Sequence, residues 1–205
     1  MTDRDCSLCP RLAEFRNANR QAFPDKFNAP VPSFGKVGSH LLIVGLAPGL
    51  RGANFTGRPF TGDYAGELLY STLIKFGFAR GNYKASPDDG LELEDCRITN
   101  AVRCVPPENK PTGQEISSCN YFLSQEITGM SDLKVIVSLG LISHNAVLKA
   151  LKQKISSFRF AHGASHAIGD FTLIDSYHCS RYNTQTGRLT EAMFHDVFEK
   201  VKNCS

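Results

Sequence analysis

Four of the seven cysteines in this 205-residue chain have a spacing that could bind a metal. Cys6 and Cys9 form a CxxC pair near the start, and Cys104 and Cys119 follow far along the chain, 15 positions apart. Four thiolates of this kind bind zinc or an iron–sulfur cluster. The wide spacing of the second pair favours a cluster, and zinc stays the alternative. Taken alone, Cys119 could also be a small apolar core residue of a helix.

A loop rich in glycine and proline, GLAPGLRGANFTGRPFTGD (45–63), follows the apolar run HLLIV. It has neither the GK[ST] ending of a P-loop nor a GxGxxG pattern, although its glycines would let a backbone approach a ligand closely. Phe60 could stack on a planar base, which is worth ~1–3 kcal/mol per base, or pack in the core. Asp63 could cap a helix, and a carboxylate there could also activate water or stabilise a cationic sugar.

Two further apolar runs end in polar residues. Asn100 interrupts RITNAVRC, and its amide could pair with the edge of a base or be a satisfied buried amide. His178 ends FTLIDSYH and is followed by hydroxyls, amides and arginines. These groups, with a helix start at Thr190, are typical contacts of a phosphate backbone, so we expect a phosphate clamp in this loop.

The elements that must position these residues alternate along the chain. Apolar runs at 40–47, 97–104, 134–140 and 171–178 indicate buried strands, and helical patterns lie between them. This alternation predicts a three-layer α/β/α sandwich with a central four-stranded parallel sheet. Ligands bind such sheets at the carboxyl ends of the strands, where three of the four runs end in polar loops. We therefore expect those loops to share one rim.

Composition adds limits rather than a function. Hydrophobic residues make up 41% of the chain, charged residues 21%, and the net charge is +3, which is ordinary for a globular protein. The sequence shows no apolar run of membrane-spanning length and no apolar region of a secretory signal at its start, so we expect a cytoplasmic protein without a membrane partner. We predict one domain, 1–205, with its N-terminal segment held by the four-cysteine site.

Five sequence segments together resemble the iron–sulfur branch of the uracil-DNA glycosylase superfamily. They are CSLCPRL, GLAPG, GRPFTGD, TNAVRCVPPENKP and HCSRYNTQTGRLT, and they span nearly the whole chain. The chain is most similar to family 5, because Leu46 is apolar where family 4 has a glutamate and Asp63 follows the phenylalanine motif. Cys179 departs from the family pattern, which has proline after the histidine.

The resemblance implies a role for each matching residue. Asp63 matches the catalytic carboxylate, His178 the hydrogen-bond donor to the leaving base, and Asn100 the amide that reads the base. Phe60 matches the aromatic residue that stacks on that base. The resemblance also matches Cys6, Cys9, Cys104 and Cys119 to the ligands of a [4Fe–4S] cluster. From the residues themselves we further predict a pocket wall (Gly45, Leu46, Ala47) and DNA contacts (Arg58, Ser180, Arg181, Tyr182, Asn183, Thr186, Arg188).

The activity that the resemblance implies is that of a monofunctional DNA N-glycosylase, acting as a monomer on damaged single- or double-stranded DNA. Such an enzyme flips a base out of the helix and hydrolyses its N-glycosidic bond. We expect uracil and other deaminated bases, such as hypoxanthine and xanthine, as substrates, because Leu46 suits a less exacting pocket. The alternatives are a strict uracil-only enzyme of the family 4 kind and a non-catalytic nucleic-acid-binding module with a cluster or zinc.

Overall fold

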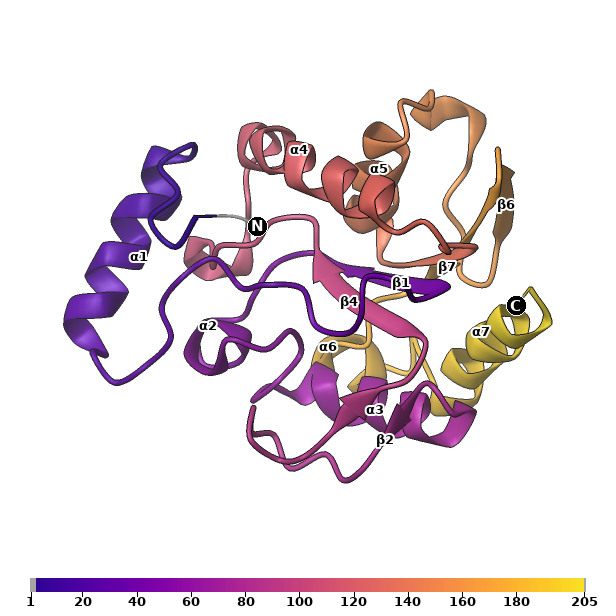
Figure 1. Cartoon of the computed structure of the whole chain (residues 1–205), viewed down its shortest axis with the longest axis horizontal. Coiled ribbons are helices and arrows are strands. Elements are labelled where there is room, and N and C mark those ends of the chain that lie inside the picture. Colours follow the sequence, from indigo (N-terminus) through magenta and orange to yellow (C-terminus); the bar gives the residue numbers. More distant parts are fainter. Residues whose placement is uncertain (1–2, 205) are drawn as a thin grey trace.

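The computed structural model describes residues 3–204, and a five-stranded sheet forms its centre (Figure 1). The strand order is β4-β1-β5-β7-β6, and the first four of these strands run parallel. Their bounds are Cys96–Asn100 for β4, Leu41–Gly45 for β1, Val135–Leu139 for β5, Phe171–Ser176 for β7 and Ser165–Ile168 for β6. The predicted four-stranded parallel sheet is therefore confirmed.

The fifth strand, β6, was not expected from the sequence. It pairs antiparallel with β7 at the edge of the sheet, and its residues SHAI are mostly exposed or half-buried. An edge strand with one neighbouring strand and one solvent-exposed face needs no continuous apolar run. The segment 156–170 therefore gives no clear strand signal in the sequence.

Helices cover both faces of the sheet, as the α/β/α prediction requires. Helices α3 (Tyr64–Phe76) and α7 (Glu191–Asn203) pack on one face, and α4 (Gly113–Gly129) and α5 (Leu141–Ala150) pack on the other (Figure 1). Successive residues of a strand point to opposite faces. In β1, Leu41 and Ile43 thus join the first core and Leu42 and Val44 the second, which explains the continuous apolar run.

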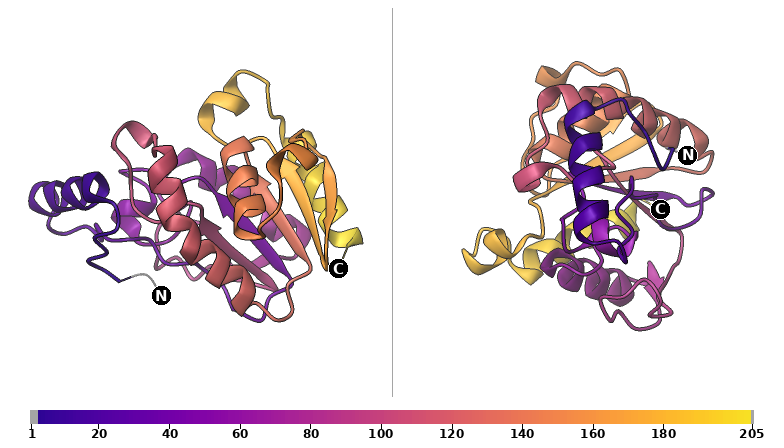
Figure 2. Two further views of the ribbon diagram at one scale, coloured as in Figure 1. Left: turned by 90° about the horizontal axis from the view of Figure 1, so that it is seen from above. Right: turned by 90° about the vertical axis from the view of Figure 1, so that its left-hand side faces the viewer.

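The shorter elements lie at the ends of the molecule and in its loops. Helix α1 (Pro10–Ala22) stands at one end, beside the loop that holds α2 (Ala53–Thr56) (Figures 1 and 2). Between α3 and β4 the chain forms a small hairpin, β2 (Ala79–Arg80) with β3 (Glu92–Leu93). The other short helices are η1 (Pro107–Asn109), η2 (Ile155–Ser157) and α6 (Arg181–Gln185). Among residues 3–204, no helix combines the length and the apolar character that crossing a membrane requires.

The carboxyl ends of β1, β4 and β7 lie at one edge of the sheet and carry the three polar loops. In the β1–β4 ladder, Gly45 is the register partner of Asn100. The last residue of β1 thus lies directly beside the amide that ends β4, and the sheet itself brings two of the expected pocket residues together.

Candidate active site

One pocket at this edge of the sheet collects the four residues for which we predicted chemistry. Phe60 and Asp63 reach it from the loop after β1, Asn100 from the end of β4, and His178 from the loop after β7. The Phe60 and His178 rings are neighbours in its lining, with their centroids 5.9 Å apart and their planes tilted by 30°. The full lining is Ala47, Pro48, Gly49, Ala53, Phe60, Asp63, Ala65, Asn100 and His178.

The predicted pocket wall is only partly as expected. Ala47 lines the pocket, whereas Leu46 is half-buried and is not among the lining residues. Gly45 has another role, because a Cβ there would lie 2.4 Å from Asn100 Oδ1 and 2.6 Å from Phe60 Cζ. Such contacts are far closer than van der Waals distance, so only glycine lets the amide and the ring approach each other.

Phe60 has a strained backbone. Its φ of 53° lies in the left-handed region, where a residue with a Cβ costs about 1–3 kcal/mol, and its side chain is nearly fully buried. Strain of this kind persists only where the surroundings enforce it. The ring is therefore held in place as part of the pocket rather than free to move into it.

Asp63 caps α3 and still presents a carboxylate to the pocket. Its Oδ1 accepts a hydrogen bond from the Gly66 N–H at 3.3 Å, as the N-cap reading predicted. Burial raises its pKa, against the two backbone N–H groups of Gly66 and Ala65, which lower it. Within residues 3–204 no lysine or arginine forms an ion pair with this carboxylate. The negative charge of the Asp63 carboxylate is therefore available to a ligand.

His178 is kept neutral by its surroundings. Burial lowers the pKa of its imidazole to about 4, so at neutral pH the ring carries one N–H and one lone pair. The Asn183 side-chain amide donates to the His178 carbonyl at 2.8 Å, which fixes the start of the loop. A neutral imidazole in this place can donate a hydrogen bond to an anionic group without bringing a charge of its own.

The loop after His178 stands away from the body of the molecule (Figure 2, gold). Ser180 caps its short helix α6, on which Arg181 and Tyr182 are exposed. Arg181 lies 5.2 Å over the Tyr64 ring and Arg188 lies 4.7 Å over the Tyr177 ring. Thr186 is exposed and Asn183 half-buried, so the predicted contacts in this loop form one accessible, positively charged edge beside the pocket.

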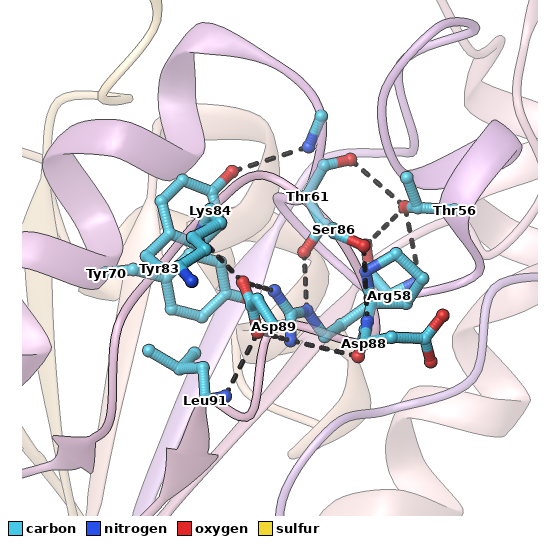
Figure 3. Close-up of polar contacts among 12 residues, drawn as sticks. Thr56, Arg58, Thr61, Tyr70, Tyr83, Lys84, Ser86, Asp88, Asp89 and Leu91 are labelled. Atoms are coloured by element: carbon cyan, nitrogen blue, oxygen red, sulfur yellow. Dashed lines mark hydrogen bonds and ion pairs between the residues drawn. The ribbon is translucent and has the colours of Figure 1, made fainter.

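Arg58 lies elsewhere than we expected from the sequence. It is buried, and its guanidinium donates two hydrogen bonds of 2.8 Å to the Asp89 carboxylate (Figure 3). Its charge is thus neutralised inside the protein, and it offers no accessible contact for a phosphate. The sequence could not show this, because the partner lies 31 residues away in a loop.

The four cysteines of the predicted metal site line a second pocket. Cys6 and Cys9 come from the start of the chain, Cys104 follows β4, and Cys119 lies in α4. Burial, with a smaller contribution from the neighbouring Cys119 and Cys6, raises the pKa of the Cys104 thiol to about 12. Apolar side chains close the pocket, whose full lining is Cys6, Leu8, Cys9, Leu12, Val102, Arg103, Cys104, Cys119 and Phe122.

The spacing of the four sulfurs bears on what the pocket fits. In a tetrahedral zinc site, Zn–S bonds of about 2.3 Å place the sulfurs about 3.8 Å apart. In the described part of the chain, the one group of three or more ligand atoms that all lie within 4.8 Å of one another is His144, His166 and Asp175. No three of these four thiols all come that close, so their arrangement is more open than a tetrahedral zinc site requires.

Sequence reasoning missed the charged residue beside these thiols. Arg16 is buried, its Nη1 donates to the Cys6 carbonyl at 2.9 Å, and it lies 4.0 Å from Cys104 Sγ. Its Nε is buried without a hydrogen-bond partner, and no carboxylate forms an ion pair with it in the region the structure covers. One signal was available: Arg16 lies seven positions after Cys9, about two helical turns, on the same side of α1.

Comparison with known proteins agrees with this geometry. The family model described as the uracil DNA glycosylase superfamily matches residues 32–202. A type-5 uracil-DNA glycosylase of Thermus thermophilus is 41% identical over 203 residues, 96% of this chain and 92% of the relative. One of Pyrobaculum aerophilum is 35% identical, over 96% and 88% of the two chains. A type-4 enzyme of Pyrobaculum aerophilum is 33% identical, but over only 74% and 63%. This chain belongs to the uracil-DNA glycosylase superfamily and, within it, to the type-5 group.

Proposed function

We propose that this protein is a DNA repair enzyme, a monofunctional N-glycosylase that removes uracil from DNA and leaves an abasic site. The observation that carries the proposal is the pocket that Phe60, Asn100 and His178 line together with the Asp63 carboxylate, which no basic side chain of residues 3–204 pairs. The relatives that share nearly the whole chain are named uracil-DNA glycosylases. A flipped base is the substrate that uses all four residues.

In this proposal the base leaves the duplex before the chemistry begins. Extruding it costs a few kcal/mol, and less when the base is mispaired, which contributes to selectivity. Phe60 then stacks on the flipped base, and the Asn100 amide donates to and accepts from its polar edge. Asn100 is nearly fully buried, so its hydrogen bonds to the base are made out of water.

The reaction replaces the bond between the sugar C1′ and the base nitrogen with a bond from C1′ to a water oxygen. The electron pair of the broken bond stays on the base. Positive charge develops on the sugar as the base leaves. Asp63 stabilises that positive charge and orients the water, and the N–H of neutral His178 donates to the anionic base. Asp63 can also take the proton that the water loses, because burial raises its pKa.

The loop after His178 binds the DNA backbone in this proposal. Ser180 offers a hydroxyl donor to phosphate, Asn183 the second hydrogen of its amide and Arg188 a cation. The exposed Thr186 hydroxyl donates to the Tyr182 carbonyl at 2.7 Å, so it would have to exchange that bond for one to phosphate. Tyr182, a residue that is 71% exposed, or Arg181 fills the gap that the flipped base leaves. Because its substrate is DNA, the enzyme would act inside the cell, as we expected from the sequence.

We further propose that Cys6, Cys9, Cys104 and Cys119 hold a [4Fe–4S] cluster. Their spread suits a cluster better than one zinc ion, and the buried, unpaired guanidinium of Arg16 would face the negative charge of a thiolate-bound cluster. Such a cluster has a structural role: it joins the start of the chain to β4 and α4, which makes residues 1–205 one domain. Purified protein should contain roughly four iron atoms per chain and absorb visible light. Colourless protein with one zinc would contradict the cluster.

The activity is tested with DNA strands that each carry one uracil, hypoxanthine or xanthine, single-stranded or paired, and a thymine strand as the control. Release of the base leaves an abasic site, which alkali converts into a strand break. We expect cleavage of the uracil strand and of both other lesions, and none of the thymine strand. Activity on uracil alone would limit the proposal to a strict uracil enzyme. Tight binding without base release from any strand would favour the non-catalytic module.

A further inference from the structure

Residues 80–95, which link α3 to β4, form an excursion that leads away from the sheet and back. The β2–β3 hairpin closes its base, and its tip lies against the pocket loop, residues 56–63, as the contacts in Figure 3 show. The comparisons and the sequence assign no role to this excursion. Its contacts with the pocket loop involve groups that the proposed reaction does not use.

Asp89 is the residue of the excursion with the most complete set of partners. Its carboxylate accepts both hydrogen bonds from the Arg58 guanidinium and two more from the backbone N–H groups of Lys84 and Leu91, at 2.9 and 3.0 Å. The Arg58 hydrogen bonds hold the pKa of Asp89 well below its usual range. All of these partners belong to the protein, so this carboxylate is not available to a ligand.

Arg58 carries the contact from the excursion into the pocket loop. Its Nε donates to Thr61 Oγ1 at 2.7 Å, and its guanidinium lies within 6.0 Å of the centroids of three aromatic rings. Phe60 lies between Arg58 and Thr61 in the sequence, so both flanks of the phenylalanine are fixed through one guanidinium. The three rings are those of Phe34, Tyr70 and Tyr83.

The backbone carbonyls around Phe60 are also held. The Tyr83 hydroxyl, from the excursion, donates to the Phe60 carbonyl at 3.2 Å, and the Tyr70 hydroxyl donates to the Pro59 carbonyl at 2.5 Å. The two tyrosine rings stack with their centroids 4.7 Å apart. The left-handed backbone of Phe60 therefore has a hydrogen-bonded partner that enforces it, and that partner is Tyr83.

The same contacts extend to Asp63. Gly66 lies against the Phe60 carbonyl and the Tyr83 hydroxyl, where a Cβ would come within 1.9 and 2.3 Å of them. The N–H of Gly66 donates to the Asp63 carboxylate. A shift of Tyr83 would therefore move Phe60 first and the cap of α3 after it.

We propose that the excursion 80–95 is a brace for the base pocket, in which Asp89 and Tyr83 are positioning residues that hold Phe60 in its strained, base-stacking conformation. This inference rests on the proposed glycosylase function. Neither residue lines the pocket, so each acts through Phe60 rather than on the base. The brace predicts that damage to the excursion weakens recognition of the base more than it weakens binding of undamaged DNA.

The test compares Asp89→Asn with Asp88→Asn, its exposed neighbour, whose carboxylate makes none of these contacts. Inhibition by free uracil, KM for a uracil strand and affinity for an undamaged strand are measured on the holoenzyme. We expect Asp89→Asn to raise the inhibition constant of uracil by about fivefold or more and KM similarly, since stacking is lost. Affinity for undamaged DNA and the Asp88→Asn enzyme should stay near the wild type. Equal inhibition constants for the two variants would overturn the brace.

Two further measurements separate positioning from simple loss of structure. In a Phe60→Ala background, Asp89→Asn should raise the inhibition constant little further, whereas fully additive effects would contradict action through Phe60. Tyr83→Phe removes only the hydroxyl, so it folds even where Asp89→Asn does not, and it should shift the inhibition constant in the same direction. Tyr83→Phe that binds uracil like the wild type would reject the brace. A wild type that releases no uracil would reject the proposed function instead.

Discussion

Asp63 and Asp89 are two carboxylates on the same side of the sheet, joined through one set of contacts, with opposite surroundings. Asp89 has Arg58 and two backbone N–H groups, which hold its pKa low. Asp63 has only the backbone cap, and burial raises its pKa. The two carboxylates therefore have different tasks: partners within the protein stabilise the ionised form of Asp89, whereas the charge of Asp63 is left for a ligand.

The two buried arginines show the same difference. Arg58 is paired on every side, whereas Arg16 has an unpaired Nε beside four cysteines. The buried cluster around Asp175 belongs to the paired class. Its carboxylate accepts from Ser138 and lies within hydrogen-bond distance of His144 and His166, so we assign it to the structure of the sheet edge.

The largest effect expected from this comparison is that of Asp63→Asn on base release. Asparagine caps a helix about as well as aspartate but carries no charge, so the fold should keep its cap. The single-turnover rate on a uracil strand should fall by about 10²–10⁴-fold, while the melting temperature changes little. Asp63→Ala, which also removes the cap, should lose the same activity and about 1 kcal/mol of stability. A rate for Asp63→Asn within threefold of the wild type would reduce Asp63 to a cap.

The next largest effect is on the free energy of unfolding, and it tests the buried ion pair between Arg58 and Asp89. Arg58→Met leaves the Asp89 charge buried without its partner, which should cost about 3–5 kcal/mol in the free energy of unfolding. The matched control is Arg80→Met, because Arg80 pairs with Glu92 on the surface of the same excursion and should matter by less than about 1 kcal/mol. Urea denaturation measures both. Similar small losses in the two variants would mean that burial adds nothing to the Arg58 pair.

Most of the fold could be predicted from the sequence because it depends on local patterns. Parallel strands buried on both faces give continuous apolar runs, and the observed β1 and β5 lie within one residue of the predicted starts. The cap at Asp63 was equally local. Strand β6 gave no such pattern, because a half-exposed edge strand needs no apolar run.

The pocket could be predicted in part, for a physical reason. Phe60, Asn100 and His178 each end or follow a strand, so the topology alone brings them to one edge. The pairing of Arg58 with Asp89 could not be predicted. An arginine in a polar loop gives the same sequence pattern whether its partner is a phosphate or a carboxylate such as that of Asp89. Likewise nothing local to Tyr83 shows that its hydroxyl reaches the Phe60 carbonyl 23 residues away.

A smaller effect is expected from Arg16, the unpaired cation. Arg16→Met removes a charge that faces the proposed cluster, so the purified variant should lose iron and visible absorbance several-fold faster than the wild type. After the metal is removed from both proteins, the methionine variant should be the more stable of the two. The metal-free wild type holds a buried charge without a partner, and the variant does not. Arg11→Met is the control, since Arg11 already pairs with Glu115 near the same site. Equal metal loss in all three proteins would contradict a charge partner role for Arg16.

The last prediction compares the two carboxylates directly, through the pH dependence of stability. The folded pKa of Asp89 lies below the ordinary value of 3.8, so its contribution to stability is complete above about pH 4 and is lost as the pH falls further. The folded pKa of Asp63 lies above 3.8, so its ionised form costs stability at neutral pH, and this cost disappears as acid protonates it. Melting temperatures from pH 3 to pH 8 should therefore show Asp89→Asn below the wild type and Asp63→Asn slightly above it. Both differences in melting temperature should shrink as the pH falls. If the Asp63→Asn protein were less stable than the wild type at pH 7, the Asp63 carboxylate of the wild type would have to be paired.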